Sequence, residues 1–153
     1  EKGLLVTILN LKHTDYIPKT LSNLFYQTYL NSEFQDADLI IPVPLSQKRL
    51  TERGFNQAEF LASDLAKQTR LSFDKTSLRR KIHTEKRRAG MDRKSRLESV
   101  KNAFEVASPR LIEEKIVLLI DDVFASGASV SNCAKALKKS GAKKVYVLTV
   151  ARA

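Results

Sequence analysis

The stretch that decides the fold is "IVLLIDDVFASGASVSNCAKAL", residues 116–137. It begins with an apolar run that lacks polar alternation, which predicts a strand covered on both faces at 115–120. Two carboxylates, Asp121 and Asp122, come directly after this run, and a loop and a helical pattern follow. Because ligands of open α/β sheets gather at the carboxyl ends of the strands, the acid pair indicates a candidate binding site.

The loop after the acid pair is built from small residues. Such side chains let backbone N–H groups approach an anion, and the start of the next helix adds unpaired donors and a partial positive charge. A phosphate therefore fits the loop, while sugar hydroxyls or a magnesium ion fit the two carboxylates. Together these components describe a phosphorylated ribose. The loop residues are Ala125, Ser126, Gly127, Ala128 and Ser129.

Other interpretations of the acid pair can be compared within the sequence. A Walker B strand requires an upstream G-x-x-x-x-G-K-[ST] loop, and none of the five glycines precedes a lysine. A phospho-receiver domain carries its acid pair near its start, whereas Asp122 lies close to the end of this sequence. The remaining alternative is that Asp121 and Asp122 only cap a turn.

The rest of the chain predicts strands that alternate with helices, and hence an α/β fold with a mostly parallel sheet. Cys133 falls on the apolar face of the helix after the loop and is expected in the core, and Gly141 is expected to end that helix. The stretch from Leu71 to Asn102 is polar and weakly periodic. Asn56 and Gln57 are expected either to cap the helix that follows them or to contact a ligand. The other elements expected are a helix at 18–30, a strand at 38–44, a loop containing Lys48, Arg49 and Arg53, a helix around 58–65, and a final strand at 143–150.

Length and composition indicate one domain over residues 1–153, large enough for its own core. No apolar run is long enough to span a bilayer, so we expect no membrane insertion. The start of the sequence lacks the pattern of a signal peptide. A single cysteine cannot form an internal disulfide, and we therefore expect a cytoplasmic protein.

The formal net charge is +10, and most of the excess lies in residues 79–96. Such a density of cations indicates an anionic partner, such as nucleic acid, a polyphosphate or a membrane surface. The segment has no Phe, Tyr or Trp, so single-stranded DNA would bind through its backbone and without sequence preference. The alternatives are a solvated face and closure over a bound ligand. The cations are Arg79, Arg80, Lys81, Lys86, Arg87, Arg88, Arg93, Lys94 and Arg96.

Four stretches of the sequence carry a resemblance to known proteins. The stretch "VLLIDDVFASGASV" resembles the phosphoribosyl pyrophosphate (PRPP) motif of type I phosphoribosyltransferases. The stretch "IIPVPLSQKRLTERGFNQAEFLA", residues 40–62, is similar to the signature of the ComF family, named for competence in DNA uptake. Residues 88–106 resemble the middle segment of that family, and "KKVYVLTVAR" resembles its closing strand.

The resemblance implies a type I phosphoribosyltransferase-like fold, with a central, mostly parallel sheet flanked by helices. It implies that Asp121 and Asp122 hold the ribose hydroxyls, assist a Mg²⁺ ion bound with PRPP and serve catalysis. It also implies that residues 125–129 cradle the 5′-phosphate and that residues 76–102 form a mobile loop over the site. Lys48, Arg49 and Arg53 then face the pyrophosphate.

The same resemblance implies a role in natural transformation, with other competence proteins as partners. The function expected is binding of PRPP with Mg²⁺ by a phosphoribosyltransferase-like protein, and phosphoribosyl transfer is its enzymatic version. The alternative is a PRPP sensor or single-stranded-DNA-binding protein without turnover. The sequence departs from the family in three respects. It lacks the N-terminal four-cysteine zinc ribbon of many members, its loop has alanine and serine where threonines are usual, and Arg88 stands where glutamine is usual.

Overall fold

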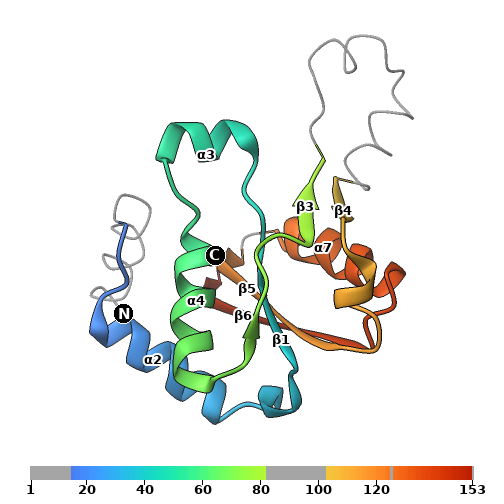
Figure 1. Ribbon diagram of the computed structural model, residues 1–153. Coiled ribbons are helices and arrows are strands. Elements are labelled where there is room, and N and C mark those ends of the chain that lie inside the picture. Colours follow the sequence, from blue (N-terminus) through green and yellow to red (C-terminus); the bar gives the residue numbers. More distant parts are fainter. Residues whose placement is uncertain (1–14, 82–102, 125, 153) are drawn as a thin grey trace.

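The computed structural model describes residues 15–81, 103–124 and 126–152 (Figure 1). In this part of the chain four parallel strands form a central sheet in the order β2-β1-β5-β6. The predicted α/β fold with a parallel sheet flanked by helices is confirmed. The strands are β1 (Leu39–Pro42), β2 (Ser72–Phe73), β5 (Ile116–Phe124) and β6 (Lys144–Arg152).

Helices cover both faces of the sheet, and a short antiparallel hairpin of β3 and β4 adds to one of them. The first of the described helices and the last of the described strands match the sequence predictions closely. The remaining elements are α2 (Lys19–Leu30), α3 (Gln47–Arg53), α4 (Gln57–Thr69), β3 (Leu78–Arg80), β4 (Phe104–Val106), α7 (Ala128–Lys139) and the 3₁₀ turns Phe34–Asp36 and Pro109–Leu111.

The β5 strand lies between β1 and β6, and its apolar run is fully buried, with no exposed surface from Val117 to Ile120. Alternate residues point to opposite faces, so Leu118 and Ile120 join one core cluster while Val117 and Leu119 join the other. This arrangement explains why the run lacks polar alternation. A strand between two covered faces can accept only apolar side chains.

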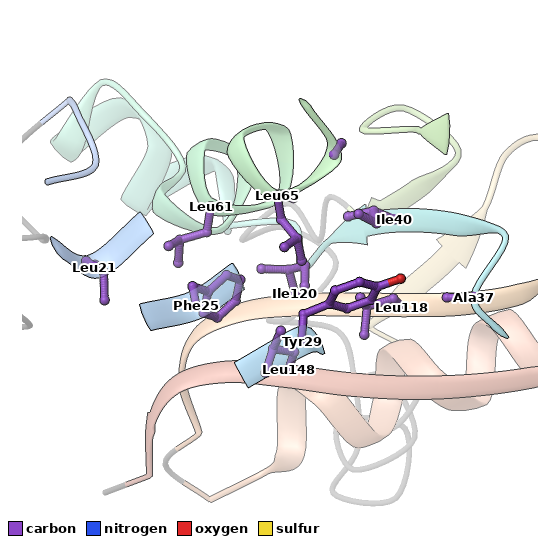
Figure 2. Packing of buried hydrophobic residues seen from close by; sticks show 12 residues of the cluster. Leu21, Phe25, Tyr29, Ala37, Ile40, Leu61, Leu65, Leu118, Ile120 and Leu148 are labelled. Carbon is purple, nitrogen blue, oxygen red and sulfur yellow. The ribbon is translucent and has the colours of Figure 1, made fainter. Parts of the chain in front are cut away.

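Helices α2 and α4 cover the first face (Figure 2). The buried side of α2 repeats at helical spacing through Leu21, Phe25 and Tyr29. Leu61 and Leu65 of α4 pack in the same cluster. The small residues of the α4 stripe allow this helix to lie close to the sheet, and the predicted amphipathic helix is confirmed.

Helix α7 and the β3–β4 hairpin cover the opposite face. Cys133 is completely buried there, which confirms its prediction as a core residue. Leu78 of β3 and Phe104 of β4 belong to the same cluster. Within the mobile loop predicted over 76–102, residues 78–80 form a strand, because Leu78 pairs with Val106 and Arg80 with Phe104. Residues 82–102 lie outside the described residues, so the rest of this prediction is not tested. The weak periodicity of three-residue strands explains why the sequence did not indicate them.

Two further expectations are corrected near the carboxyl ends of the strands. The β5 strand continues past the apolar run, with Asp121 opposite Thr149 of β6, so the acid pair lies within the strand. The expected loop after β1 is the short helix α3. The side chain of Ser46 accepts a hydrogen bond from the backbone N–H of Arg49, and this cap starts the helix.

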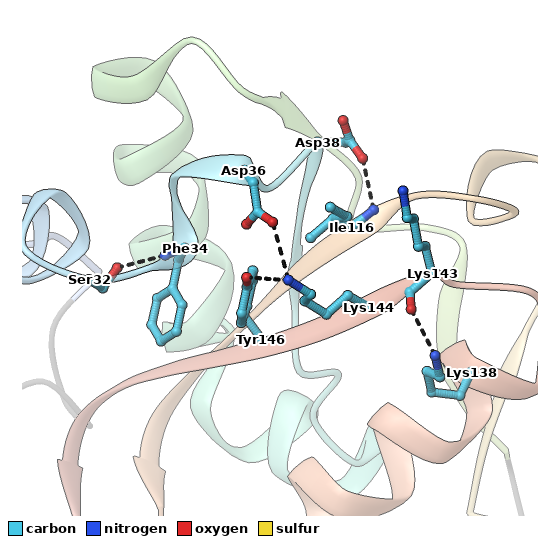
Figure 3. A network of polar contacts seen from close by, with 9 residues as sticks. All are labelled: Ser32, Phe34, Asp36, Asp38, Ile116, Lys138, Lys143, Lys144 and Tyr146. Carbon is cyan, nitrogen blue, oxygen red and sulfur yellow. Dashed lines mark hydrogen bonds and ion pairs between the residues drawn. The ribbon is translucent and has the colours of Figure 1, made fainter.

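Polar contacts at the other end of the sheet fix the strand starts (Figure 3). The backbone N–H of Ile116 donates to Asp38 Oδ2 at 2.8 Å, which aligns β5 with the start of β1. Lys144 Nζ lies 3.3 Å from Asp36 Oδ2 and donates to the Tyr146 hydroxyl at 2.8 Å. These contacts lie away from the acid pair and hold the register that places it.

Two small features complete the described fold. Gly141 has a φ of 91°, in the left-handed region, and follows the last turn of α7, as predicted. Among the helices that the structure describes, none combines the length and apolar character needed to cross a membrane.

Candidate functional site

A cavity of about 350 Å³ opens at the carboxyl ends of β1 and β5. It brings together segments that are far apart in the sequence, from the turn after β1, from α3, from β3, from the end of β5 and from the start of α7. This position is the one expected for ligands of a parallel α/β sheet. The lining residues that carry charge or belong to the predicted site are Arg49, Arg53, Arg80, Asp121, Asp122, Ser126, Gly127, Ala128 and Ser129.

The acid pair lines this cavity together with Val123. Backbone N–H groups hold both carboxylates, because Asp122 N donates to Asp121 Oδ1 at 2.9 Å and Val123 N donates to Asp122 Oδ1 at 2.8 Å. Burial, and after it the adjacent negative charge of Asp122, together raise the pKa of Asp121 to about 7. The site therefore favours a bound positive charge.

The acid pair fits a magnesium ion in its donor chemistry. Carboxylate oxygens are ligands that Mg²⁺ accepts, and a cation beside both groups offsets the repulsion that acts on Asp121. Within the described residues, no group of three or more His, Cys, Asp or Glu side chains could enclose a metal. Mg²⁺ often binds through one or two carboxylates and completes its shell with water and substrate phosphate, so two acids suffice.

The loop between β5 and α7 turns at Gly127, whose φ of 70° lies in the left-handed region that favours glycine. Gly127 is also the N-cap of α7 and offers no side chain to the first amides of the helix. The first turn of α7 has no acidic residue, and its start lines the cavity. The positive end of the helix dipole therefore faces the cavity, as the sequence predicted. Ala125 lies outside the described residues.

The three predicted pyrophosphate residues do not share one environment. Arg49 and Arg53 are four positions apart on α3, so they lie on the same face of the helix and both line the cavity. Lys48 is not among the residues that line it. Its side chain is 85% exposed, with Nζ 3.9 Å from Glu52 Oε1. In a loop, Lys48 could have faced the cavity beside Arg49. In a helix, successive side chains point about 100° apart, so Lys48 points away from the face that carries Arg49.

Asn56 and Gln57 also belong to the cavity wall, at the start of α4. Asn56 caps the helix, as predicted, because its Oδ1 accepts from Ala58 N at 3.2 Å. Its Nδ2 also donates to the carbonyl of Val43 at 3.0 Å, which ties the helix to the turn after β1. Gln57 is 2% exposed. In the sequence the polar pair follows Gly54 after one residue, which is consistent both with a helix cap and with a ligand contact.

The cations of the basic segment that lie in the described part of the chain separate along β3. The Nε of Arg79 donates to the carbonyl of Thr76 at 2.9 Å, whereas Arg80 lines the cavity with the acid pair. Lys81 lines a second cavity, of about 850 Å³, between β4 and α7. The other predicted nucleic-acid-binding residues, Lys86, Arg87, Arg88, Arg93, Lys94 and Arg96, lie outside the described residues.

The pKa of the buried Cys133 thiol depends on the charges near the start of α7. Burial raises the pKa of this thiol, the negative charge of Asp121 raises it further, and the positive charge of Arg80 lowers it. Asp121 and Arg80 therefore both lie within electrostatic reach of the same turn of α7, from β5 and from β3.

Comparison with solved structures defines the class of fold. The structure matches the allosteric regulatory enzyme of purine biosynthesis with a TM-score of 0.59 and 20% identity, over 85% of this chain and 25% of that one. It matches the purine phosphoribosyltransferase from Pyrococcus horikoshii with a TM-score of 0.54 and 15% identity, over 87% and 70% of the two chains. The domain has the type I phosphoribosyltransferase fold.

Sequence relatives define the family within this class. The chain is 30% identical to competence protein F of Haemophilus influenzae, over 99% of this chain and 68% of the relative. It is 29% identical to the DNA utilization protein YhgH of Escherichia coli O157:H7, over 98% and 66% of the two chains. No family model matches the chain. The chain belongs to the ComF family of competence proteins, and it spans about two thirds of the length of these relatives.

Proposed function

We propose that this domain binds PRPP together with Mg²⁺ at the cavity between β1 and β5, in the service of DNA uptake. The observation that carries the proposal is the convergence of the acid pair, the α7 start and two arginines of α3 on one cavity of about 350 Å³. The acid pair and the start of α7 are close together in the sequence, whereas the arginines of α3 lie far upstream of both. A turn cap alone requires no such convergence.

The chemistry of PRPP matches this arrangement component by component. The Ser126–Ser129 loop and the α7 dipole suit the 5′-phosphate, and the acid pair suits the ribose hydroxyls. Arg49 and Arg53 suit the diphosphate, since guanidinium groups bind phosphate oxygens in a forked geometry. Asp121 and Asp122 would hold Mg²⁺, which would supply charge neutralisation at the diphosphate.

The proposed reaction is transfer of the phosphoribosyl group. The bond between ribose C1 and the diphosphate oxygen breaks, the diphosphate leaves with the electron pair, and an acceptor forms the new bond to C1. The arginines of α3 stabilise the charge that develops on the leaving diphosphate, and the carboxylates face the positive charge that develops on the ribose. The alternative is a sensor that binds PRPP on the same fold without turnover.

The names of the relatives support a role in competence and DNA utilization. We place the protein in the cytoplasm, where PRPP and incoming single-stranded DNA are both present, with other competence proteins as partners. Single-stranded DNA remains a second proposed ligand, through the basic segment 79–96. A binding constant that does not change with salt concentration would argue against it, because backbone contacts release counterions.

The deciding experiment is a thermal unfolding titration with PRPP and Mg²⁺, each also added alone. At 100 times the Kd, binding stabilises the folded domain by about 2.7 kcal/mol, which raises the Tm by about 5–10 °C. The double variant Asp121→Asn/Asp122→Asn should fold and lose this shift. An unchanged Tm of the unaltered protein at millimolar PRPP refutes the proposal. Pyrophosphate release across a panel of acceptors then separates the transferase from the sensor.

A further inference from the structure

The β3 strand brings two neighbouring arginines to different environments. Arg79 and Arg80 are adjacent on the strand, so their side chains point to opposite faces of the hairpin. Arg79 is held by the carbonyl of Thr76, and it is not among the described residues that line the cavity. Arg80 lines the cavity together with Asp121 and Asp122.

An aromatic ring from the partner strand holds the Arg80 guanidinium in place. Its central carbon, Cζ, lies 5.2 Å from the centre of the Phe104 ring, within the range of a cation–π contact. Phe104 is 6% exposed and pairs with Arg80 across the hairpin. A guanidinium that stacks on a fixed ring loses less freedom when it binds an anion, because its plane is already oriented.

The charges around the cavity indicate what the Arg80 side chain can bind. No ion pair within 4 Å joins Arg80 to an acid in the described residues. As far as the described residues are concerned, its forked donors are therefore available to a ligand that carries phosphate oxygens. Arg49 and Arg53 approach the cavity from α3, whereas Arg80 approaches from the hairpin on the α7 face.

We infer that Arg80 is a further ligand-binding residue that donates charge-assisted hydrogen bonds to a phosphoryl group of the bound ligand, and that Phe104 is its positioning residue. This inference rests on the proposed function. Under this inference, Arg80 binds the ligand in the cavity and is not one of the cations that bind nucleic acid. The β3–β4 hairpin then contacts the ligand directly. A charge-assisted bond of this kind contributes about a tenfold or larger factor to affinity.

The test compares variants of the two neighbouring arginines by calorimetric titration with PRPP and Mg²⁺. We expect Arg80→Gln to weaken PRPP binding at least about tenfold and Arg79→Gln to weaken it less than about twofold. Arg80→Lys keeps the charge but lacks the fork, so its affinity should lie between those of Arg80→Gln and the unaltered protein. Titration with ribose 5-phosphate and with pyrophosphate alone identifies which phosphoryl group Arg80 contacts.

The positioning role of Phe104 has its own readout. Phe104→Leu keeps an apolar side chain but removes the ring, and we expect a two- to fivefold loss of PRPP affinity in the Arg80 protein and none in the Arg80→Gln background. Phe104→Tyr should restore the affinity. A merely structural role of Phe104 predicts the same loss in both backgrounds.

The outcomes separate this inference from the proposed function. If PRPP does not bind the unaltered protein, both fail. If it binds and the loss appears in the Asp121→Asn/Asp122→Asn variant but not in Arg80→Gln, the proposed function stands and the Arg80 inference is wrong. Equal losses for Arg79→Gln and Arg80→Gln also overturn it, because they indicate the general field of the basic segment rather than a contact.

Discussion

Replacing Asp121 by asparagine should make the protein more stable at neutral and alkaline pH while it loses its ligand. The folded carboxyl has a pKa of about 7, against 3.8 for an unperturbed group, because burial and the Asp122 charge disfavour ionisation. The folded state therefore holds this proton more tightly than the unfolded state. It follows that the free energy of unfolding falls as the pH rises from about 4 to about 7, and then stays low.

The magnitude follows from the same two values. At about 1.4 kcal/mol per pH unit, the difference between 3.8 and about 7 sets an upper limit of about 4 kcal/mol on the cost of ionising Asp121. Solvent and backbone donors at the cavity reduce it, so we expect Asp121→Asn to gain roughly 2 kcal/mol at pH 8 and close to nothing at pH 4. Asparagine keeps an oxygen that accepts from Asp122 N.

The assay is urea unfolding of both proteins between pH 4 and pH 9, without ligand or divalent cation. The difference between the two stability curves isolates Asp121, because all other titrating groups are shared. Asp38→Asn is the matched control, since Asp38 accepts from Ile116 N at the opposite end of β5 and lies away from the cavity. A variant that is no more stable than the unaltered protein at pH 8 would show that the carboxylate ionises without cost and would refute the electrostatic argument.

Three other changes test separate parts of the site. Gly127→Ala should cost about 1 kcal/mol of stability, because the φ of 70° strains a residue with a Cβ. It should also weaken binding of ribose 5-phosphate. Urea unfolding measures the first effect and calorimetry the second. Arg49→Gln should weaken pyrophosphate binding about tenfold or more, while Lys48→Gln, on the neighbouring face of α3, changes it less than twofold; equal effects would contradict the assignment. Asn56→Ala should cost about 1–2 kcal/mol in urea unfolding, because it removes both the helix cap and the bond to the Val43 carbonyl; a change below 0.5 kcal/mol would contradict this.

Local chemistry explains why the central part of the fold could be predicted. The apolar run of β5 predicts a buried strand, because a strand with both faces covered carries only apolar residues. The small residues around Gly127 predict a turn into a helix, because only such residues permit that backbone. The β5 strand continues past its predicted end at Ile120 and reaches Phe124. Pairing of Asp121 with Thr149 of β6 depends on a partner strand that is absent from the local sequence.

The predictions that failed concern segments whose local signals are weak. Charged residues of α3 carry no apolar periodicity, so the sequence suggested a loop, although the Ser46 cap and Gly54 at the other end define a helix. Strands β2 and β3 are two and three residues long and take their conformation from their neighbours. Because the sequence predicted a loop here, it did not distinguish Lys48, which points away from the cavity, from Arg49, which lines it.

The sequence by itself determined the class of this protein. Its buried strand, acid pair and small-residue turn are contiguous, so short-range sterics and hydrogen bonding specify them. Only the tertiary structure decided the membership of the site, because Arg49, Arg80 and Asp121 come from different elements whose side chains meet at one cavity. Parallel pairing through a crossover joins strands that are distant in the chain, and the meeting of their ends is therefore a property of packing rather than of any local pattern.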